Sequence, residues 1–269
     1  FEAIPLLHEA GVPIAACQLA PGDGRIGARL VSHPLTSGVA FTGSTETAWS
    51  INRALAAKQG PIVPLIAETG GLNAMIVDAT ALPEQVTDDV VASAFRSAGQ
   101  RCSALRILYL QEDVADRMLE MISGAAAELR VGDPRDPKTD LGPVIDAEAK
   151  GNLDRHVAAM RKSETVRFEG RVPNAGTYVG PTIVELRDAK TLDREVFGPI
   201  LHVVRWKAKE LDQVIASVAA TGYGLTLGIH SRIDETVDAI VEKLAVGNVY
   251  VNRNVIGAVV GTQPFGGSG

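Results

Sequence analysis

Short apolar runs alternate with amphipathic segments along nearly the whole chain. Apolar runs bounded by turn-forming residues predict strands, and apolar residues spaced three and four apart predict helices. The predicted strands are 13–19, 37–41, 62–67, 73–78, 105–110, 165–168, 182–186, 200–206, 225–230 and 248–252. The predicted helices are 1–10, 24–31, 45–59, 83–97, 113–129, 146–162, 209–220 and 235–244. Strands that alternate with helices indicate an α/β fold built from parallel βαβ units with right-handed crossovers.

Two glycines after Thr69 mark the predicted boundary between two lobes. The segment before them has the pattern of half a nucleotide-binding domain, and the segment after them that of a second α/β lobe. Residues 131–141 are rich in Gly, Pro and Asp and are predicted to form a loop. The chain begins at Phe1 inside an amphipathic pattern and stops on a glycine-rich segment, so we expect it to be a fragment of a longer protein.

Composition narrows the functional classes. At 269 residues, the chain is long enough for two modest lobes, and 46% hydrophobic with 22% charged residues is ordinary for a folded globular protein. A formal charge of −6 argues against binding nucleic acid or an anionic membrane through general basic character. No segment approaches the roughly 18 apolar residues of a membrane span, and we expect no signal peptide.

The two cysteines differ in their surroundings. They cannot form a disulfide framework, and no ligand spacing among them and the five histidines suggests a metal site, so a reducing cytoplasm is expected. Cys17 lies in the apolar run 13–19 and is expected to be structural and buried. Cys102 lies in the polar sequence Gly-Gln-Arg-Cys-Ser, where Arg101 and free backbone amides could stabilise a thiolate. A nucleophile and a buried structural thiol are equal alternatives for Cys102.

Two glutamates are candidate site residues. Glu68 ends the predicted strand 62–67, and the carboxyl ends of parallel strands are where α/β proteins bind ligands. It could be a general base for a water molecule, a solvated strand end, or half of an ion pair at the hinge. Glu195 stands just before a Gly-Pro turn, and by itself indicates no more than a turn that precedes a strand.

The strand-to-helix junction Phe-Thr-Gly-Ser is a candidate phosphate contact. Gly43 allows a ligand to approach closely, and the N-terminus of the next helix offers free amides. A plain helix cap at Ser44 is the alternative. Ala48 stands where a second glycine of a dinucleotide fingerprint is expected.

Six motifs follow one another along the chain: Phe-Thr-Gly-Ser, Glu-Thr-Gly-Gly, Gly-Gln-Arg-Cys, Gly-Asp-Pro-x5-Asp-x-Gly-Pro, Glu-Val-Phe-Gly-Pro and Pro-Phe-Gly-Gly. This series resembles the aldehyde dehydrogenase superfamily over nearly all of the chain. The resemblance implies oxidation of an aldehyde to a carboxylic acid through a covalent thioester. It implies Cys102 as the nucleophile and Glu68 as the residue that activates the hydrolytic water. The oxyanion asparagine and an adenosine-ribose lysine would lie upstream of Phe1.

The resemblance also implies a dinucleotide site. Gly43 and Ser44 match the phosphate-binding turn of the family, and Thr42 lies toward the nicotinamide. Glu195 would hydrogen-bond the nicotinamide ribose, and Phe197 would pack near the ring. NAD is the implied cofactor, with NADP as the alternative, and FAD enters only if a proline dehydrogenase domain precedes the chain.

The implied fold is aldehyde dehydrogenase-like, a partial Rossmann-type NAD-binding domain followed by an α/β catalytic domain. Residues 1–69 would form the C-terminal part of the NAD-binding domain. Residues 70–260 would form the catalytic domain, and residues 261–269 would begin a C-terminal return segment.

Within the superfamily, Gln-Arg-Cys-Ser and Gly-Ala-Val-Val-Gly-x-Gln-Pro-Phe-Gly-Gly resemble the Δ1-pyrroline-5-carboxylate (L-glutamate γ-semialdehyde) dehydrogenase branch, as in the dehydrogenase part of bifunctional proline utilization A proteins. This branch implies that Ser103 and the amides of Gly257 and Ala258 hold the substrate's α-carboxylate, while Phe265 flanks its aliphatic chain. An ordinary turn is the alternative for Gly257 and Ala258.

The implied substrate is L-glutamate γ-semialdehyde, and a homo-oligomer is expected for the full-length parent. A dehydrogenase for another small aldehyde, such as succinate semialdehyde, is the alternative among enzymes. A truncated module without catalysis is the alternative outside them, and the chain alone is expected to have weak or no activity.

Overall fold

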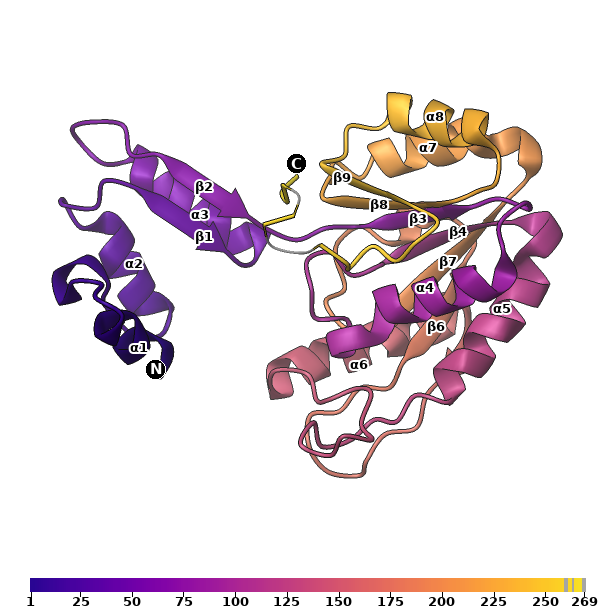
Figure 1. Ribbon diagram of the computed structural model, residues 1–269, viewed down its shortest axis with the longest axis horizontal. Coiled ribbons are helices and arrows are strands. Elements are labelled where there is room, and N and C mark those ends of the chain that lie inside the picture. The colour runs from indigo at the N-terminus through magenta and orange to yellow at the C-terminus, as the bar shows by residue number, and fades with distance from the viewer. Residues whose placement is uncertain (259–260, 263, 268–269) are drawn as a thin grey trace. The chain divides into compact units, whose positions relative to one another are not determined.

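The computed structural model describes residues 1–258, 261–262 and 264–267 and divides into two compact units (Figure 1). Unit 1 is Phe1–Thr69 and unit 2 is Gly70–Gly269. Both units contain helices and parallel strands, so the predicted α/β class is confirmed. Among the described residues, no helix combines the length and the apolar content needed to cross a membrane.

Unit 1 contains a two-stranded parallel sheet. Its elements are α1 (Ala3–Glu9), the 3-10 helix η1 (Ile14–Ala16), α2 (Gly24–Ser32), β1 (Val39–Thr42), α3 (Thr45–Ala56) and β2 (Leu65–Glu68). The register of β1 and β2 pairs Thr42 with Glu68. α3 connects the two strands and begins at a side-chain cap, because the hydroxyl of Ser44 accepts a hydrogen bond from the amide of Thr47 at 3.2 Å.

The strand predicted over 13–19 is wrong. This segment contains η1 instead. Throughout residues 1–69, all of them described, β1 and β2 pair only with each other, so the segment has no neighbouring strand with which to form a hydrogen-bonded ladder. Cys17 is half-buried, not buried within a strand as expected, and a hydrogen bond of 2.8 Å joins its carbonyl to Nε2 of His8.

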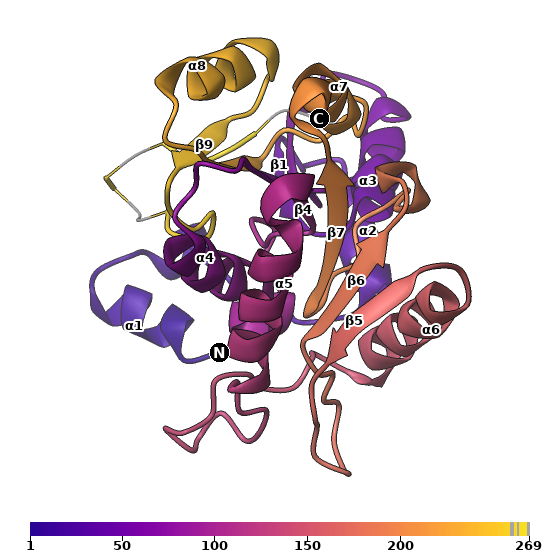
Figure 2. The same cartoon turned by 90° about the vertical axis from the view of Figure 1, so that its right-hand side faces the viewer.

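Unit 2 is built on a seven-stranded sheet in the order β5-β6-β7-β4-β3-β8-β9. The strands are β3 (Ala74–Val77), β4 (Ile107–Gln111), β5 (Thr165–Glu169), β6 (Thr182–Leu186), β7 (Ile200–Trp206), β8 (Thr226–His230) and β9 (Asn248–Val251). Figure 2 shows β4, β7, β6 and β5 following one another. All neighbours are parallel except β5 and β6, which no helix connects, and a connection without a crossover favours antiparallel pairing.

Helices cover both faces of this sheet (Figure 1). They are α4 (Pro83–Phe95), η2 (Arg96–Gly99), α5 (Glu112–Ala127), α6 (Ala147–Ser163), η3 (Ala189–Thr191), η4 (Ala208–Glu210), α7 (Leu211–Ala219) and α8 (Asp234–Lys243). Met75 and Val77 of β3 pack with residues of α4 and α5, whereas Ala74 and Ile76 pack with residues of α6, α7 and α8. The central strand is therefore apolar on both faces, as a covered parallel sheet requires.

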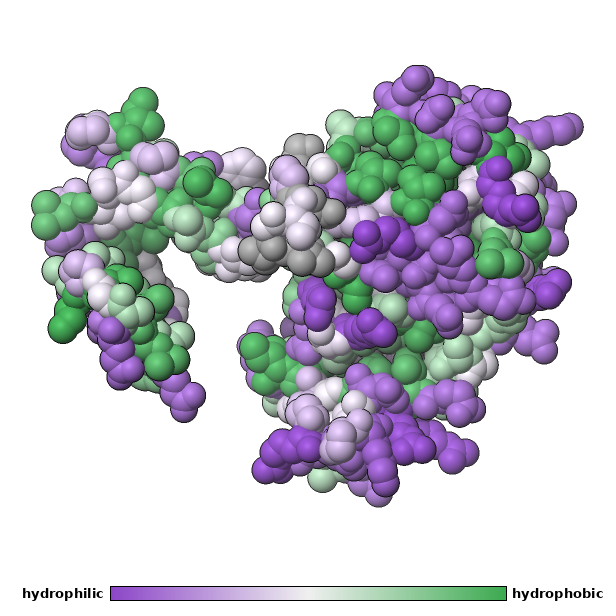
Figure 3. Space-filling model, viewed as in Figure 1, coloured by the Kyte–Doolittle hydropathy of each residue, from purple (hydrophilic) through white to green (hydrophobic). Residues whose placement is uncertain are grey.

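Unit 1 buries far less apolar surface than unit 2. Of residues 1–69, only Ala48 and Leu55 are buried. Large apolar side chains are exposed on its helices, on its loops and on β2, and hydrophobic residues on its surface are green in Figure 3. They include Leu6, Ile14, Ile26, Leu30, Leu35, Trp49, Ile62 and Ile66. Hydrophobic burial within unit 1 therefore contributes little to its stability.

Candidate active site

Cys102 is half-buried on a loop between η2 and β4, the kind of connection that the sequence predicted. The approach to this loop contains three consecutive residues in the left-handed region: Ser97 (φ 57°), Ala98 (φ 51°) and Gly99 (φ 64°). This conformation costs about 1–2 kcal/mol for a residue with a Cβ. A Cβ at position 99 would also collide with the carbonyl of Gly198. The course of the chain toward Cys102 therefore requires glycine at position 99.

Asn73 holds the cysteine loop by its backbone. This buried side chain donates hydrogen bonds to the carbonyls of Cys102 at 2.6 Å and Ala104 at 2.9 Å. Its Oδ1 accepts a hydrogen bond of 3.2 Å from the amide of Thr226. Asn73 directly precedes β3 and Thr226 begins β8, so one side chain ties the loop to two strands. Asn73 was not among the site residues predicted from the sequence, although a polar side chain at the start of an apolar run was a signal for it.

Arg106 is completely buried beneath the same loop. Its Nη1 donates to the carbonyl of Gly99 at 2.8 Å, and its Nη2 donates to the carbonyl of Arg101 at 3.0 Å. Nε and Nη2 also donate to Oε1 of Glu195, at 3.2 and 2.9 Å. The guanidinium therefore joins the backbone just before Cys102 to the segment that contains Glu195.

The Arg106–Glu195 pair has unusual electrostatics because it is buried. Burial lowers the pKa of Arg106, and the charge of Glu195 and its hydrogen bonds with Arg106 oppose that effect. Burial raises the pKa of Glu195, and the charge of Arg106 together with hydrogen bonds from Arg106 and the Gly71 amide opposes the rise. Arginine remains protonated at neutral pH in proteins, so the arrangement favours an ionised pair.

The cation buried beneath the loop is Arg106. Arg101 is exposed, and its Nε donates to Oγ of Ser97 at 3.0 Å. Arg106 was overlooked because it belongs to the apolar run 105–110, where a strand was predicted.

Phe197 and Ser103 border the same region. The ring of Phe197 is 46% exposed, and its centroid lies 5.2 Å from Cζ of Arg106. Ser103 is only 7% exposed, and its carbonyl accepts a hydrogen bond of 3.3 Å from Oγ1 of Thr226. The structure thus brings the predicted residues 102, 103, 195 and 197 around one buried guanidinium and one buried amide.

These residues gather at the amino ends of the parallel strands of unit 2. The cysteine loop leads into β4, Asn73 leads into β3, Thr226 begins β8, and Glu195 precedes β7. Ligands of open α/β sheets usually bind at the opposite, carboxyl ends. The expectation that ligands bind at the carboxyl ends of strands therefore does not predict the position of this cluster.

The loop after β9 returns to this amino edge along α4. The amide of Val255 donates to Oγ of Ser93 at 3.1 Å, and the carbonyl of Ser93 accepts a hydrogen bond of 3.0 Å from the amide of Leu105. Gly257 and Ala258 follow within three residues and are half-buried. One serine of α4 therefore connects the cysteine loop with the loop predicted to hold the substrate's carboxylate.

The segment that contains Phe265 is hydrogen-bonded to the first residue of β9. The carbonyl of its neighbour Gly266 accepts a hydrogen bond of 2.8 Å from Nδ2 of Asn248, the first residue of β9, and Phe265 is 44% exposed. The end of the predicted catalytic domain at residue 260 and the predicted return segment 261–269 fall partly on residues 259–260, 263 and 268–269, which lie outside the described residues.

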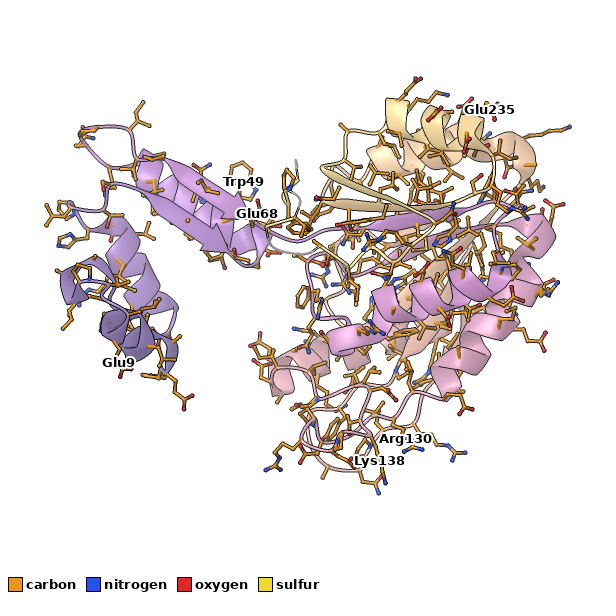
Figure 4. All side chains as sticks on the ribbon, viewed as in Figure 1. Glu9, Trp49, Glu68, Arg130, Lys138 and Glu235 are labelled. Atoms are coloured by element: carbon orange, nitrogen blue, oxygen red, sulfur yellow. The ribbon has the colours of Figure 1, made fainter. Side chains whose placement is uncertain are left out.

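In unit 1, the predicted cofactor residues and Glu68 meet at the carboxyl ends of β1 and β2. Thr42 pairs with Glu68, and the amide of Gly43 donates to the carbonyl of Glu68 at 3.1 Å. Glu68 is exposed at the end of β2 (Figure 4). α3, capped by Ser44, begins directly after β1, so its first amides and the positive end of its dipole lie at the same strand ends. This geometry fits the phosphates of a nucleotide.

Comparison with known proteins identifies the relatives of this chain. The chain matches the Aldehyde dehydrogenase family over residues 2–269. It is 54% identical over 280 residues to the bifunctional protein PutA of Klebsiella aerogenes, which covers 100% of this chain and 21% of that protein. It is 37% identical over 274 residues to 1-pyrroline-5-carboxylate dehydrogenase of Geobacillus sp. (strain WCH70), which covers 99% of this chain and 53% of that protein. The chain thus spans about a fifth and about half of these relatives.

Solved structures agree with the sequence relatives. A mutant of Bradyrhizobium japonicum proline utilization A (PutA) matches with a TM-score of 0.98 and 65% identity over 100% of this chain and 28% of that chain. 1-Pyrroline-5-carboxylate dehydrogenase from Thermus, solved with bound NAD, matches with a TM-score of 0.93 and 34% identity over 99% of this chain and 52% of that chain. The resemblance carried by the six motifs is confirmed, and the chain belongs to the aldehyde dehydrogenase family.

Proposed function

We propose that this chain supplies the nucleophile of an NAD-dependent dehydrogenase that oxidises L-glutamate γ-semialdehyde to L-glutamate. The names of the PutA and 1-pyrroline-5-carboxylate dehydrogenase relatives support this substrate. The observation that carries the proposal is the setting of Cys102. It is half-buried on a loop that Asn73 and Arg106 hold by its backbone, which is the fixed position that a nucleophile needs.

In the proposed reaction, Sγ of Cys102 attacks the aldehyde carbon, a C–S bond forms, and the negative charge moves to the aldehyde oxygen. A bound dinucleotide would supply the acceptor for the hydride that this carbon loses. Cys102 then carries a thioester. Glu68 takes a proton from a water molecule as the water attacks the thioester carbon. The C–S bond breaks, the carboxylic acid leaves, the sulfur is restored as the thiolate that began the reaction, and Glu68 releases its proton to solvent.

The substrate's other end would be held by unit 2. The hydroxyl of Ser103 and the amides of Gly257 and Ala258 donate hydrogen bonds to the α-carboxylate, and Phe265 borders the aliphatic chain. The hydrogen bonds of Ser93 to both loops support a common position for these donors.

Five residues are proposed to contact the cofactor. Gly43 and Ser44 hold its phosphate region at the ends of β1 and β2, and Thr42 lies toward the nicotinamide, in keeping with the NAD bound to the Thermus relative. Glu195 accepts a hydrogen bond from the nicotinamide ribose, and Phe197 packs against the ring. A carboxylate has room for this additional hydrogen bond, since it accepts about four.

The test is Cys102→Ala in the complete polypeptide that contains this chain, with NADH formation from glutamate γ-semialdehyde as the readout. We expect turnover to fall at least about 10³-fold while NAD still binds. The matched control, Cys17→Ala, removes the other thiol and should leave turnover unchanged. Turnover near that of the unmodified protein in Cys102→Ala would reject the nucleophile. A higher kcat/KM for succinate semialdehyde than for glutamate γ-semialdehyde would reject the substrate.

A further inference from the structure

We propose that Ser93 is a positioning residue that sets the distance between the nucleophile and the amides that receive the substrate's carboxylate. This inference deepens the proposed function and rests on the roles given there to Cys102, Gly257 and Ala258. Ser93 lies in α4 and is completely buried, so it has no surface with which to contact an aldehyde. It acts through the two loops to which it is hydrogen-bonded.

The backbone of Ser93 holds the cysteine loop. α4 ends at Phe95, so the carbonyl of Ser93 is among the last carbonyls of the helix, which generally lack a partner within it. The amide of Leu105, three residues after Cys102, supplies a hydrogen bond of 3.0 Å. This contact involves no side-chain atom, so a change of the Ser93 side chain leaves it in place.

The side chain of Ser93 holds the loop after β9. Its Oγ accepts a hydrogen bond of 3.1 Å from the amide of Val255, and neither residue has exposed surface. Without Oγ, this buried amide would have no partner, at a cost of about 1–3 kcal/mol. Since buried backbone amides are almost always paired, we expect the loop to move until Val255 finds another acceptor.

A tight turn carries the position of Val255 to the proposed carboxylate donors. Nη2 of Arg253 donates to the carbonyl of Gly257 at 3.3 Å, and Val255 is the middle residue of the turn that this bond closes. The peptide bond between Gly257 and Ala258 is trans, so its carbonyl and its N–H point in opposite directions. The amide of Ala258 therefore points away from the guanidinium of Arg253. Its direction depends on the turn that Ser93 holds at the centre.

The start of the same loop is fixed independently of Ser93. Nδ2 of Asn252 donates to the carbonyl of Ser231 at 2.9 Å, and its Oδ1 accepts a hydrogen bond of 3.2 Å from the Ser231 amide. Nε2 of Gln85, also in α4, donates to the carbonyl of Asn252 at 2.6 Å. Loss of Oγ of Ser93 therefore acts on the part of the loop nearest the proposed donors and leaves its start in place.

A purely structural role for Ser93 gives a different expectation. If Ser93 only stabilised the fold, its replacement would affect the oxidation of every aldehyde in the same proportion. A positioning role affects only those aldehydes that carry the carboxylate, because the cysteine loop keeps its bond to the backbone of residue 93. Propanal has no carboxylate and therefore reports on the nucleophile alone.

The experiment measures NADH formation by the complete protein at saturating NAD, with glutamate γ-semialdehyde and with propanal. Ser93→Ala should raise the KM for glutamate γ-semialdehyde about tenfold and change kcat by less than about twofold. Its kcat/KM for propanal should stay within about twofold of the parent. The matched control is Thr87→Val, since Thr87 is a buried residue of α4 whose hydroxyl donates to the carbonyl of Pro83 within the helix at 2.8 Å. It should leave both substrates unaffected.

An unchanged KM for glutamate γ-semialdehyde in Ser93→Ala, or an equal loss of kcat/KM with both aldehydes, would overturn the proposal. Circular dichroism checks that each variant folds. If Ser93→Ala does not fold, Ser93→Cys replaces the hydroxyl with a weaker acceptor and must raise the same KM. A failure of the proposed function appears in the unmodified protein, whereas a failure of this inference appears only in the variants.

Discussion

Asn73→Ala should lower the free energy of unfolding of unit 2 by about 3 kcal/mol. The wild-type side chain makes three hydrogen bonds, to the carbonyls of Cys102 and Ala104 and from the amide of Thr226. Each bond contributes about 1 kcal/mol, and its loss leaves a largely buried backbone group without its partner. Asn73→Asp is the sharper variant, because it keeps an acceptor for Thr226 but turns a carboxylate toward two carbonyls. It should cost at least as much as alanine.

Urea unfolding followed by fluorescence can isolate this effect. In a Trp49→Phe background, the remaining tryptophan is Trp206, which is buried in β7 and therefore reports on unit 2. Asn174→Ala, in an exposed loop, is the matched control and should cost less than about 0.5 kcal/mol. A cost for Asn73→Ala below about 1 kcal/mol, or equal to that of the control, would refute the reasoning that these bonds hold the cysteine loop.

Two further predictions concern stability. Gly99→Ala should lower the free energy of unfolding in urea by about 2 kcal/mol more than Gly222→Ala does. Both glycines have positive φ, but only a Cβ at position 99 would meet a carbonyl, that of Gly198. Equal losses in the two variants would contradict this reasoning. Burial lowers the pKa of His202 from its ordinary 6.5 to about 3. As the pH falls below about 6.5, the unfolded state therefore binds a proton that the folded state does not, and the free energy of unfolding decreases. His202→Asn should therefore lose about 2 kcal/mol less than the parent between pH 7 and pH 5, and equal losses would contradict the assignment.

Much of the fold follows from the hydrophobic pattern because unit 2 surrounds its sheet with helices. Strands such as 73–78 and 200–206 are apolar on both faces, and the amphipathic helices between them follow a different period. The hydrophobic pattern gave a wrong prediction at 13–19, because this apolar run has no neighbouring strand in unit 1 with which to pair. Apolar character predicts burial, but only a partner strand completes a hydrogen-bonded ladder.

The candidate site was only partly predictable. Cys102 was recognisable because its polar, glycine-containing surroundings are unusual for a buried thiol. Asn73 and Arg106 were missed because each stands beside or within an apolar run and their partners are distant in sequence. Their function depends on contacts among the amino ends of several strands, and strand order and register are not encoded in local periodicity.

The two glycines at the junction of the units have a consequence for chimeric proteins. Boundaries between compact units usually tolerate exchange and insertion. Here a Cβ on Gly70 would collide with the carboxylate of Glu195, and one on Gly71 would lie 2.8 Å from Oδ1 of Asn73. Both glycines therefore belong to the packing of unit 2. A graft that replaces unit 1 with that of a relative should join at Thr69 or earlier, so that the glycine pair travels with the cysteine loop.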